Sequence, residues 1–270
     1  GVSCCYAPMV ATVGGWFEAR RTLALGLAVA GIGTGTLVMV PLVEWVIDNQ
    51  GWRDAYRLLA IMTAVLLTIA AIGAHRPPTS SASPVPIREA IRGRVDFWIL
   101  YVSSILISIT LFTPFVFLAD YIDTVGGTGS AAVLLGLIGM SSIAGRLGFG
   151  AVAARIGITG LYQLSFLVLS LSVLLWIVAD TSYSLLILFA VVLGVAYGGF
   201  IALSPAVVAV RFGVVGMGGV LGALYTAAGV GGLVGPPTIG AIIDASGHTA
   251  AQITALVSGL LGTALLLTMR

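Results

Sequence analysis

The chain consists of long apolar segments separated by short polar or glycine-rich breaks. Helices of about 20 apolar residues cross the roughly 30 Å of hydrocarbon in a bilayer, and eight segments reach that length. We therefore predict eight complete transmembrane helices, at approximately 22–46, 55–74, 97–119, 131–151, 158–179, 183–209, 214–243 and 249–269. Another apolar stretch, Val2 to Val13, is too short to cross, and we expect it to be part of a ninth helix cut near its middle.

The composition also favours helices that lie in a membrane. Hydrophobic residues make up 59% of the chain and charged residues 8%, against about a quarter charged in a typical globular chain. The 36 glycines and 10 prolines fit membrane helices, whereas a β-barrel would alternate apolar and polar residues. We predict an all-α membrane protein. The two cysteines, Cys4 and Cys5, are adjacent, and we expect them to be packing residues that hold no metal.

The arginines are distributed unevenly between the two ends of the predicted helices. With alternate loops on opposite sides, ten of the 12 basic residues fall on one side: Arg20, Arg21, Arg76, Arg88, Arg92, Arg94, Arg146, Arg155, Arg211 and Arg270. The other side holds Arg53 and Arg57, and it collects seven of the 10 acids: Glu44, Asp48, Asp54, Asp120, Asp123, Asp180 and Asp244. The positive-inside rule therefore predicts that the Arg-rich side and the C-terminus are cytoplasmic.

Two further expectations follow from the charged residues. Lysine is absent, which suggests a GC-rich coding sequence, so we expect the cytoplasmic membrane of a bacterium, with membrane lipid around the helices. The basic residues form no run long enough to predict a nucleic-acid partner.

A polar segment divides the chain into two parts. Residues 76–96 open with Pro77-Pro78 and are rich in serine and proline, a composition typical of a linker. We therefore predict a partial N-terminal helical half at 1–75, a cytoplasmic linker at 76–96 and a C-terminal six-helix half at 97–270. Within the linker, residues 87–92 have the spacing of a short amphipathic helix, and a solvated connector is an equal alternative.

The three helices before the linker share a pattern with the last three. Ala7-Pro8 matches Ser204-Pro205, Leu25-Gly26 matches Leu221-Gly222, Ala30 to Gly33 matches Ala228 to Gly231, Pro41 matches Pro236 or Pro237, and Asp48 to Gly51 matches Asp244 to Gly247. Both copies run in the same direction, so they are parallel repeats. Parallel repeats joined by a cytoplasmic linker resemble the two six-helix halves of a major facilitator. The resemblance implies that the chain covers about nine helices: the last three of the first half and all six of the second.

Local motifs narrow this resemblance to the monocarboxylate carriers and the related oxalate/formate antiporters. The segment from Trp16 to Gly31 is similar to the junction between their fourth and fifth helices, residues 51–56 to the start of the sixth, and Pro114 to Leu118 to a motif of the seventh. The segment from Gly145 to Gly157 resembles the loop between helices eight and nine of facilitators generally. Ala154 stands where facilitators usually carry an Asp, which weakens the charge-relay reading of that loop. Ser142 and Phe117 stand where the carriers have an acid and a histidine, which places proton coupling of that type in doubt.

Arg146 is the sharpest candidate for binding a substrate. It lies one helical turn after Ser142 on the same face, about fifteen residues into its predicted helix. An arginine that faced an inner cavity would bind a carboxylate through two parallel hydrogen bonds. An arginine at the cytoplasmic end of the helix would instead act as a conformational latch, and the sequence favours neither role.

The other candidates are polar, aromatic or small residues within the predicted helices or at their ends. For substrate binding they are Tyr197, Phe200, Tyr225, Thr226, Phe115 and Tyr121, for each of which packing between helices is the commoner use. For gating they are Arg20, Arg21, Gly31, Gly33, Gly235, Pro236 and Asp120. The glycines would let two helices approach closely, and we expect Gly235-Pro236-Pro237 to break its helix near the outer end.

We therefore expect a secondary active transporter that moves a small organic anion, similar to a monocarboxylate, by alternating access. The alternatives are a facilitator or efflux pump for another small molecule, and a non-transporting fragment. We expect no enzyme activity, no cofactor and no metal site, because His75 and His248 both fall at helix ends and the acids do not converge with them. A coupling proton or a counter-anion would be a further partner.

Overall fold

A computed structural model of the chain describes residues 9–10, 12–17, 21–75, 93–125, 129–213 and 217–269. Cys4, Cys5, Arg20 and the predicted amphipathic segment at 87–92 lie outside the described residues. The backbone of Arg21 is described as the start of a helix, but its side chain is not.

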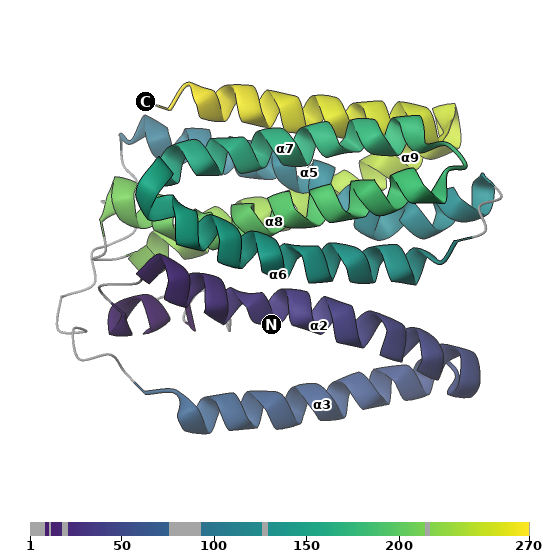
Figure 1. Ribbon diagram of the computed structural model, residues 1–270, viewed down its shortest axis with the longest axis horizontal. Helices are drawn as coiled ribbons and strands as arrows, with labels where there is room; N and C mark the ends of the chain where they lie inside the picture. Colours follow the sequence, from purple (N-terminus) through teal and green to yellow (C-terminus); the bar gives the residue numbers. More distant parts are fainter. Residues whose placement is uncertain are drawn as a thin grey trace.

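The described residues form long helices and no strand. Seven of them are long and apolar enough to cross a membrane: α2 (Arg21–Gln50), α3 (Trp52–Gly73), α5 (Val95–Thr124), α6 (Ala131–Ile156), α7 (Ile158–Ala179), α8 (Tyr183–Phe212) and α9 (Met217–Leu267). Figure 1 shows them as an up-and-down bundle, in which α9 turns back on itself. The predicted all-α membrane fold is confirmed.

The turn within α9 lies at Gly247, whose φ of 82° is in the left-handed region that glycine adopts without strain. α9 is thus two membrane helices, which gives eight described spans at the eight predicted places. The prediction of a break at Gly235-Pro236-Pro237 was wrong, because the helix continues through both prolines to the turn at Gly247. Membrane helices tolerate proline where neighbouring helices and side chains satisfy the carbonyls that it leaves without a donor.

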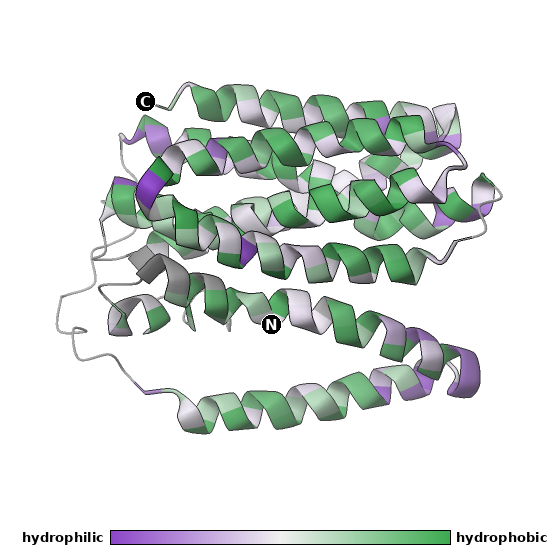
Figure 2. Cartoon of the chain, in the orientation of Figure 1, coloured by the Kyte–Doolittle hydropathy of each residue, from purple (hydrophilic) through white to green (hydrophobic). Residues whose placement is uncertain are grey.

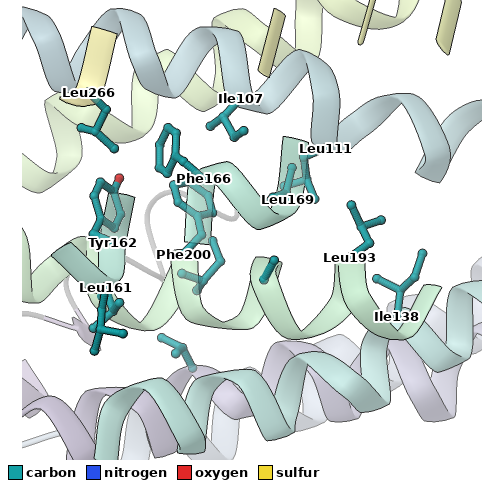
Figure 3. Close-up of a cluster of buried hydrophobic side chains, with 14 of the residues drawn as sticks. Ile107, Leu111, Ile138, Leu161, Tyr162, Phe166, Leu169, Leu193, Phe200 and Leu266 are labelled. Atoms are coloured by element: carbon teal, nitrogen blue, oxygen red, sulfur yellow. The ribbon is translucent and has the colours of Figure 1, made fainter. Parts of the chain in front are cut away.

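The C-terminal helices pack into one bundle, with α5 against α9, α6 against α8, and α7 against both α8 and α9 (Figure 1). Its centre is an apolar and aromatic cluster. Figure 3 shows Tyr162 and Phe166 of α7 lying beside Phe200 of α8, and their rings have centroids 4.9 to 5.9 Å apart. Lipid is as apolar as these side chains, so the hydrophobic effect does not hold the cluster together. Close packing and dispersion contacts do so instead.

Small and hydroxyl residues let α5, α7 and α9 approach closely. The Thr110 hydroxyl donates to the Ala255 carbonyl at 2.7 Å, and the Ser258 hydroxyl donates to the Leu106 carbonyl at 2.9 Å. A Cβ added at Gly259 would meet the hydroxyls of Thr110 and Ser170. These contacts join α5 to the second part of α9 through backbone acceptors.

The N-terminal helices are attached mainly through α2. α2 packs along α6 and also contacts α8, whereas α3 contacts α2 less extensively and diverges from it in Figure 1. Only 6% of the most apolar window of α3 is buried. The contact of α2 with α6 is therefore the principal described contact between the two predicted halves.

Charged residues gather at the two ends of the bundle. Figure 2 shows hydrophilic positions at both ends and apolar positions between them. We call one end the Arg-rich end, where Arg94, Arg155 and Arg211 lie, and the opposite one the acidic end, where Asp48, Asp120, Asp180 and Asp244 lie. The membrane therefore encloses the middle of each helix.

Candidate functional site

Arg146 lies inside the bundle between α6, α8 and α2. Its side chain is 0% exposed, although it is about ten residues, or about 15 Å, from the end of α6. The Nη1 group donates to the Ser142 hydroxyl at 2.7 Å, and that hydroxyl donates to the Gly139 carbonyl at 2.6 Å. The structure thus places Arg146 in the interior and orients its guanidinium by a hydroxyl one turn away.

The Tyr197 ring of α8 faces this guanidinium, and an aromatic residue of α5 packs on that ring. The Cζ atom of Arg146 lies 5.3 Å from the centroid of the Tyr197 ring, in a cation–π arrangement. Phe115 of α5 packs edge-on against Tyr197, with centroids 6.1 Å apart and an interplanar angle of 68°. Four of the predicted substrate residues, Arg146, Ser142, Tyr197 and Phe115, are therefore brought together by three helices.

Gly33 of α2, in the predicted N-terminal half, lies close over the guanidinium. A Cβ added at Gly33 would lie 2.6 Å from the Gly139 carbonyl oxygen and 2.7 Å from both Arg146 Nη1 and Ser142 Oγ. A residue with any side chain would not fit there in this arrangement. Gly31, by contrast, is exposed and a Cβ there would meet nothing within 4 Å. Of these two predicted gating glycines, Gly33 makes the close contact.

Glycines outside the predicted site residues bring α8 close to α6 beside Ser142 and Arg146. A Cβ at Gly198 would overlap the Ser142 carbonyl oxygen and lie 2.9 Å from the backbone nitrogen of Arg146. A Cβ at Gly194 would lie 2.5 Å from the Ile138 carbonyl oxygen. A Cβ at Gly145 would overlap the Val195 carbonyl in return. Gly194 and Gly198 are four residues apart, the small-xxx-small spacing of tightly packed membrane helices, and this spacing could have identified them.

Phe200, Tyr225 and Thr226 lie nearer the Arg-rich end, away from the guanidinium. Phe200 and Tyr225 line a cavity of about 10 Å³, enough for about one water molecule, together with Ser104, Ser204, Leu224 and Ala228. The Thr226 hydroxyl is 3.0 Å from that of Tyr101. Phe200 is 6% exposed because it also belongs to the aromatic cluster of Figure 3. Phe200 and Thr226 therefore make their described contacts outside the group around Arg146.

The remaining predicted residues lie closer to the acidic end. Tyr121 is buried against Trp176, with centroids 5.6 Å apart, and Asp120 is exposed beside His248. Gly235 packs on α5, where a Cβ would lie 3.3 Å from Ile109, and the adjacent Pro236 is half-buried. None of the four touches the group around Arg146.

A larger groove opens toward the acidic end between α2, α3, α5 and α6. Its volume is about 440 Å³, and its lining is apolar except for Glu44. The other lining residues are Met39, Val40, Val43, Ile47, Leu59, Ala119, Ala131, Ala132 and Leu135. Across the residues that the structure describes, no three His, Cys, Asp or Glu side chains come together as metal ligands would.

Comparison with known families finds a match to the Major Facilitator Superfamily over residues 1–179. Among curated proteins, the chain is 28% identical to "Monocarboxylate transporter 12" of Xenopus laevis, with 93% of the chain and 62% of that protein aligned. It is 31% identical to "Monocarboxylate transporter 13" of Rattus norvegicus and 30% identical to "MFS transporter asaE" of Aspergillus flavus, over 98% and 100% of the chain and 63% and 62% of those proteins. The chain thus spans about 62% of the length of these relatives, which are eukaryotic.

Solved structures share the fold. The human organic anion transporter MFSD10 superposes with a TM-score of 0.73 at 16% identity, covering 97% of the chain and 67% of that protein. FucP in its outward conformation gives a TM-score of 0.70 at 13% identity, covering 100% and 72%. At these identities the likeness concerns the arrangement of helices alone.

Proposed function

The chain belongs to the Major Facilitator Superfamily and is an integral membrane protein, and we propose that the natural protein carries a small organic anion of the monocarboxylate type by alternating access. The observation that carries this proposal is the buried guanidinium of Arg146 between the two halves. The names of the relatives that are monocarboxylate transporters support the same substrate class.

The electrostatics around Arg146 favour an anionic ligand. A charged group inside a membrane protein is costly unless an opposite charge or hydrogen bonds stabilise it. The Ser142 hydroxyl accepts one of its hydrogen bonds, and the Tyr197 ring lies beside it. A substrate carboxylate would add a negative charge and accept charge-assisted hydrogen bonds from the planar guanidinium. Tyr197 and Phe115 would then pack against the apolar part of the same small molecule.

The contact between α2 and α6 supports access by movement of the halves. Gly33 lies directly over Arg146 Nη1, so a ligand reaches the guanidinium only when α2 moves away from α6. Movement of one repeat against the other around a central site is how transporters of parallel-repeat architecture work. Gly33 would therefore act as the cover of the site, and the arrangement described here is the covered one.

Exchange of a radiolabelled monocarboxylate by the natural full-length protein in liposomes tests this proposal. We expect Arg146→Lys to lower the exchange rate by about tenfold to a hundredfold, since a hydrogen bond to a charged group contributes about 1.5–3 kcal/mol and lysine cannot replace the planar pair. Arg155→Lys is the matched control, because Arg155 lies on the same helix but is exposed at the Arg-rich end.

Three results would contradict the proposal. Equal exchange in the two arginine variants would exclude Arg146 as the carboxylate site. Transport of an uncharged small molecule, without transport of any monocarboxylate, would favour the alternative facilitator or efflux pump. Absence of all transport by the natural protein would favour a non-transporting protein.

A further inference from the structure

The small cavity between α5, α8 and α9 has hydroxyl groups in its wall. Ser104 of α5 and Ser204 of α8 line it from two helices, and its volume is about 10 Å³. Ser104 is 8% exposed, so this polar wall lies inside the bundle. The rest of the lining consists of Phe200, Leu224, Tyr225 and Ala228.

The two serines can accept more hydrogen bonds than their protein neighbours donate. The Tyr162 hydroxyl of α7 lies within hydrogen-bonding reach of both Ser104 and Ser204. A hydroxyl group has one proton and two lone pairs, so three hydroxyls carry three donors and six acceptor positions. Lone pairs on the serine oxygens are therefore open to a further donor, and a water molecule supplies two.

The backbone of α8 is interrupted beside this cavity. Pro205 follows Ser204 inside the helix, and a proline has no N–H to donate to the carbonyl of the preceding turn, here that of Ile201. In membrane helices such carbonyls are satisfied by neighbouring helices, by hydroxyl side chains or by ordered water. The cavity therefore adjoins a place in α8 where a water molecule has a structural use.

The cavity also lies midway between two contacts that join α5 to α8. At the Arg-rich end, Arg94 Nη1 donates to the Arg211 carbonyl at 2.9 Å, and at the level of Arg146, Phe115 packs on Tyr197. Ser204 is seven residues, or about 10 Å, from both Tyr197 and Arg211 along α8. Elsewhere α5 packs mainly on α9, and α8 packs mainly on α6 and α7.

We propose that one water molecule is bound in this cavity and joins α5 to α8, donating one hydrogen bond to the Ser104 hydroxyl oxygen and one to that of Ser204. The volume and the two polar partners meet the requirements of a buried water. The bound water connects the two helices at the level where α8 passes its proline. The site belongs to the helix bundle itself, so it does not depend on which molecule the natural protein carries.

X-ray radiolysis of the natural full-length protein tests for this water. Hydroxyl radicals formed from a bound water oxidise the side chains next to it, even where bulk solvent does not reach. We expect Phe200, which lines the cavity and is 6% exposed, to be oxidised in the natural protein. Changing both Ser104→Ala and Ser204→Ala should lower the rate at Phe200 by about threefold or more, because an apolar cavity of this size stays dry.

Two controls accompany this measurement. Ser184→Ala removes an exposed hydroxyl from the other end of α8 and should leave the oxidation of Phe200 unchanged. Phe189 is 0% exposed, stacks on Trp176 and lines neither described cavity, so it should stay unoxidised in every variant. The proposal is overturned if Phe200 is oxidised equally in the natural protein and in the double variant, or no faster than Phe189 in the natural protein.

A density map of the natural protein in lipid nanodiscs tests the site without any substitution, and so does not depend on whether the double variant folds. At a resolution that shows ordered water, we expect one peak within about 3.2 Å of both serine oxygens. A map that shows other internal waters but no peak at this place overturns the proposal. Neither measurement uses transport, so a failure of the proposed function would leave both results intact.

Discussion

At the scale of single residues, the guanidinium of Arg146 is positioned from three directions. Ser142 accepts its hydrogen bond from one turn away on α6, the Tyr197 ring lies beside it on α8, and the backbone at Gly33 covers it on α2. These contacts hold the guanidinium inside the bundle, where it is 0% exposed. A side chain this enclosed has few rotamers, which lowers the entropy lost when a ligand is bound.

Gly33→Ala is expected to lower monocarboxylate exchange by about tenfold. The added methyl would lie 2.6 Å from the Gly139 carbonyl oxygen, and a backbone atom cannot move aside as a flexible side chain can. Overpacking of this kind typically costs about 1–3 kcal/mol, and a factor of ten in the population of the covered state corresponds to about 1.4 kcal/mol. The rate of exchange in liposomes measures the effect.

Gly31→Ala is the control for this substitution, because Gly31 is two residues away on the same helix and has open space around it. It should exchange at the rate of the natural protein. Equal rates in the two alanine variants would show that the close contact at Gly33 has no part in the transport cycle.

At the scale of helices, the packing of α8 on α6 determines where the Arg146 site is built. Gly194 and Gly198 remove side chains from the face of α8 that meets α6, and Gly145 does the same in the opposite direction. Tyr197 is adjacent to Gly198 and is thereby held at the level of Arg146. In a bilayer, where apolar surface gains little from leaving lipid, such close backbone approach supplies much of the energy of helix association.

Gly198→Ala should destabilise the bundle by about 1–3 kcal/mol, because the methyl would overlap the Ser142 carbonyl. We expect the thermal unfolding midpoint in detergent, followed by loss of the monodisperse peak on heating, to fall by several degrees. Gly222→Ala serves as the comparison, since a Cβ at Gly222 on α9 meets nothing within 4 Å. Alanine has the higher helix propensity, so propensity alone would raise the midpoint in both variants. A midpoint that falls equally in both variants would contradict the packing argument.

Hydropathy predicted the positions of the helices well, because the thickness of the hydrocarbon core fixes the length of each apolar segment. The predicted helix at 158–179 coincides with α7, and the one at 22–46 became α2, which continues through Asp48, Asn49 and Gln50 to its end. Polar residues beyond the hydrocarbon lower the hydropathy without ending the helix. The break expected at Pro236-Pro237 failed for a different reason, since proline signals a helix end in water more strongly than in a membrane bundle.

The site was less predictable than the helices, because its members are joined by tertiary contacts. Ser142 and Arg146 are one turn apart on one helix, so their pairing follows from sequence spacing. Nothing in the periodicity of α2 distinguishes Gly33, which covers Arg146, from Gly31, which is open. The pairing of His248 with Asp120 depends on the turn at Gly247. From sequence alone, the position of His248 at a helix end had argued against a functional site there.

At the scale of the whole molecule, the two ends of the bundle differ in charge. Arg94, Arg155 and Arg211 lie at one end, while Asp120, Asp180 and Asp244 lie at the other. Loops rich in arginine stay in the cytoplasm during insertion, so the Arg-rich end is predicted to be cytoplasmic. The acidic end, with Asp120, Asp180 and Asp244, would then face the exterior.

This orientation can be measured by single cysteines placed at the two ends, after Cys4 and Cys5 are changed to serine. Thr181→Cys lies at the acidic end in the turn between α7 and α8, and Ile156→Cys lies at the Arg-rich end of α6; both positions are exposed. In intact cells, a membrane-impermeant maleimide should label Thr181→Cys within minutes and should label Ile156→Cys only after permeabilisation. The reverse pattern would place the acidic end in the cytoplasm and contradict the orientation that the arginine distribution predicts.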